Sequence, residues 1–259
     1  GDDLWVAYSV SKEDMWVSRV PVPIRRTLSG PVADDFDDME AGGVVTDWNV
    51  YSPTWCPVEV VDGPEPTGKS LRLTDRDPID YAKAMRVFGA APKQTIRFTL
   101  WIESSASPLD IEVTSGRGAR HVQLRVDTEG NLVVRQHEQA RRLASLEIGR
   151  WYDVVINVDS EGRSYGLSLD GQVLVAKHPY ADEGAAFGDR GAPSERIVLR
   201  TGDYRMTRDL AECKSGSEQV PGFDEPGVDE PIEPATYYIG SFKTVHTEDT
   251  TQHIATGSE

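Results

Sequence analysis

The sequence predicts an all-β fold, a sandwich of two antiparallel sheets. Segments of strand length recur along most of the chain and are bounded by Gly, Pro, Asp or Asn. Within them apolar and polar residues alternate, as in strands with one buried face. Asp170-Gly171 between two such segments is a strong hairpin signal. The one helix-compatible patch, Glu138–Leu146, is short and uncapped.

The run from Gln94 to Arg135 is the centre of this pattern. It contains four predicted strands in succession: Thr95–Glu103, Leu109–Thr114, His121–Asp127 and Asn131–Gln136. Further segments of the same kind are Lys69–Thr74, Ala84–Phe88, Trp151–Val158, Tyr165–Leu169, Val173–Ala176, Arg196–Arg200 and Tyr237–Thr244. In the first strand Ile96, Phe98, Leu100 and Ile102 share one face, which a second sheet has to cover.

The opposite face of these strands carries groups suited to binding. The contact residues predicted on it are Arg97, Trp101, His121, Gln123 and Arg125, with Arg135, His137, Arg200 and Tyr204 as additional candidates. Trp and Tyr rings can stack on sugars, and Arg pairs with carboxylate or sulfate. We therefore expect one polar face that recognises a glycan, an acidic one in particular. The alternative is an ordinary solvated face with cross-strand pairs such as Arg97 with Glu112.

Composition limits the class of protein. The 259 residues suffice for one or two domains with a sizeable core. The net charge of −16 is concentrated in Asp34–Glu40, Ser215–Thr236 and His246–Glu259, which argues against binding nucleic acid or an anionic membrane. The sequence contains no run of about 18 apolar residues, so we predict no insertion into a membrane. Cys56 and Cys213 are either two buried thiols or one disulfide.

Gly63–Ser70 reads GPEPTGKS and fits the P-loop pattern by letter. Pro64 and Pro66 lack the N–H groups that would cradle a phosphate, and a strand pattern follows where a helix is required. We therefore predict no nucleotide site.

Two resemblances extend this prediction. The opening DLWVAYSVSKEDMWVSRVPVPI, a hairpin of Leu4–Val10 and Met15–Val20, resembles the closing strands of a sialidase-like β-propeller built from bacterial neuraminidase repeats. The later segments ADDFDDMEAGGVVTDWNVYSPTW, KSLRLTD, TIRFTLWIES, RWYDVVINVD, GLSLDGQVL and TYYIGSFKT are similar, in that order, to concanavalin A-like or laminin G-like jelly-roll domains. The implied organisation is a hairpin and linker at 1–28, a jelly-roll sandwich at 29–245 and a polar tail at 246–259.

The jelly-roll resemblance also implies a structural Ca²⁺. Asp35 and Asp37 are the predicted ligands, because Ca²⁺ takes six to eight oxygen atoms and four acids cluster at Asp34–Asp38. Gly240-Ser241 occupies the place where these domains would supply further ligands. A solvated acidic turn is the alternative.

The resulting hypothesis is a non-catalytic carbohydrate-recognition or accessory module of a secreted or periplasmic sialidase-like glycoside hydrolase, next to a propeller. One alternative is a jelly-roll lyase or hydrolase acting on an acidic glycan, with His121 or Tyr204 transferring protons and Arg125 holding a carboxylate. A hydrolase needs two carboxylates about 5–10 Å apart. The sequence has no E-x-D-x-x-E strand pattern, for which Asp110-Ile111-Glu112 alone is no replacement, and no G-x-S-x-G elbow. The other alternative is a purely structural domain that docks against a propeller.

Overall fold

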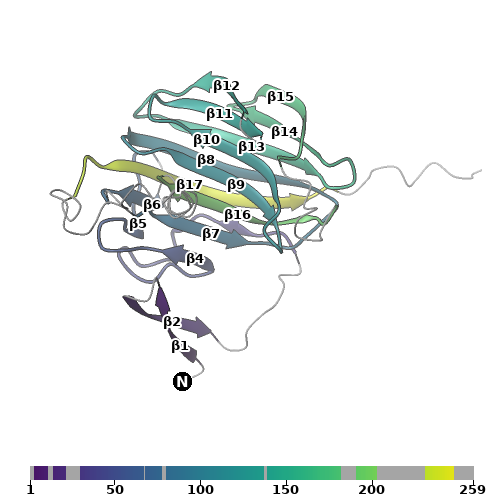
Figure 1. Ribbon diagram of the computed structural model, residues 1–259. Coiled ribbons are helices and arrows are strands. Elements are labelled where there is room, and N and C mark those ends of the chain that lie inside the picture. The colour runs from purple at the N-terminus through teal and green to yellow at the C-terminus, as the bar shows by residue number, and fades with distance from the viewer. Residues whose placement is uncertain are drawn as a thin grey trace, which may run out of the picture.

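The protein is a two-sheet antiparallel β-sandwich, which confirms the predicted fold class (Figure 1). The computed structural model describes residues 3–10, 14–21, 30–66, 68–77, 80–136, 139–181, 191–202 and 231–247, and these form strands, turns and no helix. His137, Glu138, Tyr204, Cys213, most of the Pro-rich acidic segment and the polar tail beyond Thr247 lie outside this part of the chain.

One sheet has seven strands: β4 (Trp48–Tyr51), β7 (Lys83–Val87), β9 (Leu109–Ser115), β10 (Arg120–Val126), β11 (Asn131–Gln136), β12 (Gln139–Ser145) and β16 (Ser194–Thr201). Their order is β12-β11-β10-β9-β16-β7-β4. The helix-compatible patch at Glu138–Leu146 is therefore mostly the edge strand β12. It pairs with β11 across a short turn and extends the sheet.

The other sheet has eight strands: β3 (Ala33–Asp34), β5 (Val58–Asp62), β6 (Lys69–Asp75), β8 (Lys93–Ser105), β13 (Trp151–Asp159), β14 (Ser164–Leu169), β15 (Gln172–Pro179) and β17 (Ala235–His246). Their order is β15-β14-β13-β8-β17-β6-β5, with β3 paired to β17. Lys69 begins β6, so the stretch after GPEPTG is a strand, as predicted.

The core lies between the sheets, where the apolar residues of alternating strands meet. Ile96, Phe98, Leu100 and Ile102 of β8 are each at most 1% exposed, and Val122, Leu124 and Val126 of β10 in the other sheet are 0% exposed. Burying a side chain of this size is worth about 1.5–3 kcal/mol. Cys56 is also buried in this core as a free thiol, with its Sγ 3.4 Å from Oδ1 of Asp75.

The N-terminal segment forms a separate two-stranded sheet of β1 (Asp3–Val10) and β2 (Asp14–Pro21), paired along their whole length. The predicted hairpin is therefore confirmed. Its strands make no ladder with either sheet of the sandwich. Leu4, Trp5, Val6 and Val17 are exposed on it.

A buried ion pair connects the opening of the sandwich to the seven-stranded sheet. Arg86 of β7 donates from Nε and Nη2 to the two carboxylate oxygens of Asp34 at 2.8 and 2.9 Å, and from Nη1 to the Asp47 carbonyl at 2.9 Å. Both side chains of the Arg86–Asp34 pair are 8% exposed.

Replacing Arg86 with Met should destabilise the fold by about 3–5 kcal/mol, because the buried Asp34 carboxylate loses its partner. The free energy of unfolding from urea titration measures the loss. Arg97→Met is the control, since Arg97 is 62% exposed and its pair with Asp153 should contribute less than about 1 kcal/mol. Equal losses in the two variants would contradict the assigned role of the Arg86–Asp34 pair.

Candidate functional site

The five predicted contact residues do not share one face. Arg97 and Trp101 lie on β8 in the eight-stranded sheet, whereas His121, Gln123 and Arg125 lie on β10 in the seven-stranded sheet. The expectation of a single polar face is therefore wrong. The Ser-Pro connection after Ser105 is a crossover between the sheets, so the two strands that it joins are not neighbours.

On the outer face of the seven-stranded sheet, Arg125 belongs to an ion cluster centred on Asp110. Arg125 donates to the two oxygens of the Asp110 carboxylate at 2.6 and 2.9 Å, and Arg200 of β16 binds the same carboxylate. Arg200 also donates to the Gly202 carbonyl at 2.6 Å. Asp110 and Arg200 are each 2% exposed, so their charges interact mainly with one another and little with solvent.

Glu112 and Lys83 extend this cluster. Burial raises the pKa of the Glu112 carboxyl, and Arg120, 3.6 Å away, acts in the opposite direction. Burial and then the charge of Arg200 lower the pKa of Lys83. Gln123 lies opposite Glu112 in the ladder. The pairing of Arg97 with Glu112 is wrong, because Arg97 pairs with Asp153 at 2.7 Å.

His121 is a buried residue of the sandwich. A bulge between Arg120 and Val122 removes His121 from the regular ladder, and such a bulge redirects the side chain. Its ring stacks on Tyr180 at 4.1 Å, and its Nδ1 is 2.7 Å from the Ser194 hydroxyl. It is 1% exposed, and its ring already has partners in Tyr180 and Ser194, so it is poorly placed to contact a ligand.

The outer face of the eight-stranded sheet carries an aromatic row. Trp151 of β13, Trp101 of β8 and Tyr238 of β17 are direct neighbours across three adjacent strands. The Trp101 and Trp151 ring centroids are 5.6 Å apart at 56°. Both rings are partly exposed, as stacking on a sugar requires.

Three contacts hold this aromatic row in place. The Trp151 indole N–H donates to the Pro64 carbonyl at 3.2 Å, and Tyr238 Oη donates to Glu103 at 2.7 Å. A Cβ at Gly240 would lie 2.9 Å from the Trp151 ring, so a glycine there lets the indole lie close to the sheet. Sequence reasoning found Trp101 but missed Trp151 and Tyr238, although the alternation in their predicted strands was available as a signal.

A shallow hollow of about 450 Å³ lies further along the same sheet, at β13, β14 and β15. Its lining includes the polar side chains of Asn157, Ser164, Ser168 and Lys177, together with Tyr165. Gly166 contributes no side chain to it, and a Cβ there would lie 3.1 Å from the Ala176 carbonyl. The eight-stranded sheet thus combines an aromatic row and a partly polar hollow, both of which suit a saccharide.

The predicted calcium ligands lie in an exposed turn. Asp37 Oδ1 accepts from the Lys69 amide at 2.8 Å, and Asp35 Oδ1 accepts from the Asp37 amide at 3.3 Å. No group of three or more His, Cys, Asp or Glu residues in the described ranges could hold a metal ion. Calcium at Asp35 and Asp37 stays a prediction.

The described residues include no helix that is long and apolar enough to span a membrane.

Comparison with known proteins agrees with this architecture. The chain matches a solved sialidase at 30% identity and a TM-score of 0.78, over 95% of its own length and 21% of the sialidase chain. It therefore spans about a fifth of that sialidase. A Crh5 transglycosylase (14% identity, TM-score 0.53, 85% of each chain) and the cellulose-induced protein Cip1 (12%, 0.52, 83% of this chain and 97% of that one) share the fold.

A comparison with curated protein sequences gives no match. Residues 48–213, more than half of the chain, match the family described as "Sialidase-like, CBM domain". The chain belongs to the sialidase-like CBM domain family.

Proposed function

We propose that this chain is a non-catalytic carbohydrate-recognition module of a larger, extracytoplasmic sialidase-like glycoside hydrolase. The observation that carries the proposal is the partly exposed pair of Trp101 and Trp151 on the outer face of the eight-stranded sheet. Membership in a carbohydrate-binding family and similarity to a segment of a sialidase support it. Trp101 is the proposed stacking residue, and Arg97 lies four residues before it on the same strand face.

The arrangement gives the lyase alternative little support. His121, its proton-transfer candidate, is buried against Tyr180 and Ser194. Arg125, its carboxylate clamp, already binds Asp110 with two hydrogen bonds. Recognition without chemistry requires neither residue, and it uses the face on which the aromatic row lies.

Trp101→Ala should weaken glycan binding by about tenfold or more, because a stacking ring is lost from the binding face. Trp101→Phe should retain most of the affinity. A glycan array followed by calorimetric titration measures this, with Trp5→Ala on the hairpin as the control for loss of an exposed indole. Titrations with Ca²⁺ and with EGTA test the calcium prediction in parallel.

Unchanged affinity in Trp101→Ala would show that the aromatic row is not the recognition site. Absence of binding to neutral and acidic glycans alike, by a folded wild-type chain, would favour the structural alternative in which the domain docks against a neighbour.

We also propose that the β1–β2 hairpin belongs to a neighbouring propeller. It forms its own two-stranded sheet, and such a sheet is at best marginally stable in water. Its exposed apolar residues include Trp5, 64% exposed, and Val17, 62% exposed. A second protein surface that covers them would stabilise both the hairpin and the arrangement of the two domains.

A chain that begins at Gly30 should melt within about 2 °C of the full chain, because the hairpin adds no ladder to the sandwich. Circular dichroism measures the midpoint of thermal unfolding. The Arg86→Met variant shows in the same assay how far the midpoint falls when the sandwich itself is destabilised. A decrease of several degrees on truncation would mean that the hairpin is part of the sandwich.

A further inference from the structure

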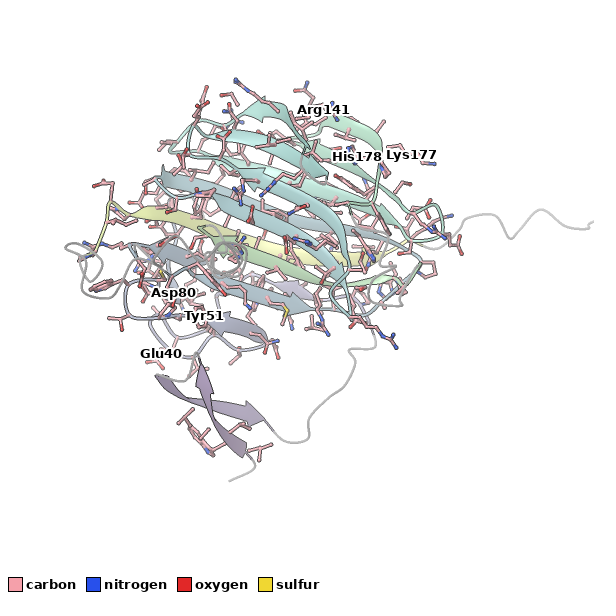
Figure 2. All side chains as sticks on the ribbon, in the orientation of Figure 1. Glu40, Tyr51, Asp80, Arg141, Lys177 and His178 are labelled. Atoms are coloured by element: carbon pink, nitrogen blue, oxygen red, sulfur yellow. The ribbon has the colours of Figure 1, made fainter. Side chains whose placement is uncertain are left out.

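The two sheets end at the same side of the sandwich in a pair of edge strands that carry cationic side chains. β12 is the edge of the seven-stranded sheet and β15 the edge of the eight-stranded sheet, and Figure 1 shows them at the same end of the sandwich. We call Arg141 of β12, Tyr165 of β14, and Lys177 and His178 of β15 the edge cluster. Figure 2 shows Arg141, Lys177 and His178 at this end of the sandwich.

Tyr165 is the centre of the edge cluster. It lies opposite His178 in the ladder, with ring centroids 5.2 Å apart, and the Arg141 charge acts on its hydroxyl. Arg141 lies opposite Val134, whose side chain is in the core, so it is on the side of β12 that faces the second sheet. Three strands of two sheets therefore bring Arg141, Tyr165 and His178 together. Lys177 is the chain neighbour of His178 but lies on the outer face of the eight-stranded sheet, where it lines the hollow.

The Tyr165 hydroxyl is a buried polar group without a hydrogen-bond partner among the described residues. The residue is 2% exposed. Leaving a buried donor unpaired costs about 1–3 kcal/mol. Burial raises the pKa of this hydroxyl, with Arg141 acting in the opposite direction, so the group is a neutral donor at physiological pH.

The edge cluster carries two exposed cationic side chains, Arg141 and Lys177. Neither forms an ion pair with another residue in the ranges that the structure describes. His178 donates from Nδ1 to the Pro179 carbonyl at 2.8 Å, so Nε2 is the ring nitrogen that this hydrogen bond does not use. Arg141 is the only charged group among these residues that shifts the pKa of Tyr165.

We propose that the edge cluster binds one anionic group, the carboxylate or sulfate of an acidic saccharide. Arg141 supplies a planar pair of donors and Tyr165 a neutral donor, while Lys177 adds a positive charge from the adjoining outer face. Lys177 also lines the 450 Å³ hollow on that face, together with Asp159. The saccharide part of this inference rests on the proposed function, whereas the anion site itself does not.

The anion site is tested first with anions alone. The chain is titrated with sodium sulfate and with sodium acetate at constant ionic strength set by sodium chloride, and backbone amide shifts are followed by NMR. Shifts at Tyr165, Lys177 and His178 that are lost in Arg141→Gln support the site, and the anion that produces them identifies the preferred group. Arg142→Gln is the matched control, because Arg142 is the next residue of β12, is exposed, and lies opposite Val133 on the other side of the strand.

The saccharide is then tested by calorimetry with lactose, sialyllactose and sulfated lactose. We expect at least one acidic sugar to bind about tenfold more tightly than lactose, corresponding to about 1.4 kcal/mol, and Arg141→Gln to abolish this preference. Tyr165→Phe should reduce the preference by about threefold or more, because it removes one donor and keeps the ring. Arg142→Gln should retain it.

Two results would overturn the edge site: no amide shift at the cluster with either anion, or shifts that persist in Arg141→Gln. Equal affinity for acidic and neutral lactose would overturn the saccharide assignment. Failure of the proposed function is distinguishable, because a chain that binds no sugar at all still gives a clear answer in the anion titration, and Trp101→Ala does not alter the edge cluster.

Discussion

The two sheets must bury each other's apolar faces, and this constraint determines where every other group can lie. β8 is the clearest case, because it pairs with both β13 and β17 and alternates between core and outer face from Lys93 to Glu103. Once Ile96, Phe98 and Leu100 are committed to the core, Arg97, Thr99 and Trp101 must face outward. The outer faces carry no share of the core and so are available for binding.

The two outer faces differ in physical character. The seven-stranded sheet places Asp110 and Glu112 on its outer side, where Arg125, Arg200 and Arg120 neutralise them. A buried charge is destabilising without its partner, so these side chains are engaged in ion pairs within the sheet. The eight-stranded sheet instead presents partly exposed rings and a shallow hollow. This contrast is the physical reason for assigning recognition to the latter face.

Much of the fold could be predicted from the sequence, because strand period and turn residues are local properties. The inward positions of β8 and β10 and the Asp170-Gly171 hairpin were predicted in this way, and the ladder confirms them. The assignment of β8 and β10 to different sheets could not be predicted, since a short polar connection can form a hairpin or a crossover with the same residue types. Sequence alternation also could not reveal the bulge that buries His121 or the pairing of Arg97 with Asp153.

The edge cluster was beyond sequence reasoning for a related reason. Arg141, Tyr165 and His178 are separated along the chain and meet only because two sheets end together. Trp101 could be identified because a lone indole among alternating polar residues is a local signal. Trp151 and Tyr238 carried a similar local signal, but their position in one row with Trp101 follows only from the placement of β13 and β17 on either side of β8.

The most direct test of the central claim is a crystal structure of the chain with the tightest-binding oligosaccharide from a glycan array. The account predicts a sugar ring stacked on Trp101, with the rest of the ligand on the outer face of the eight-stranded sheet. A sugar bound on the outer face of the seven-stranded sheet, beside Arg125 and Gln123, would contradict it.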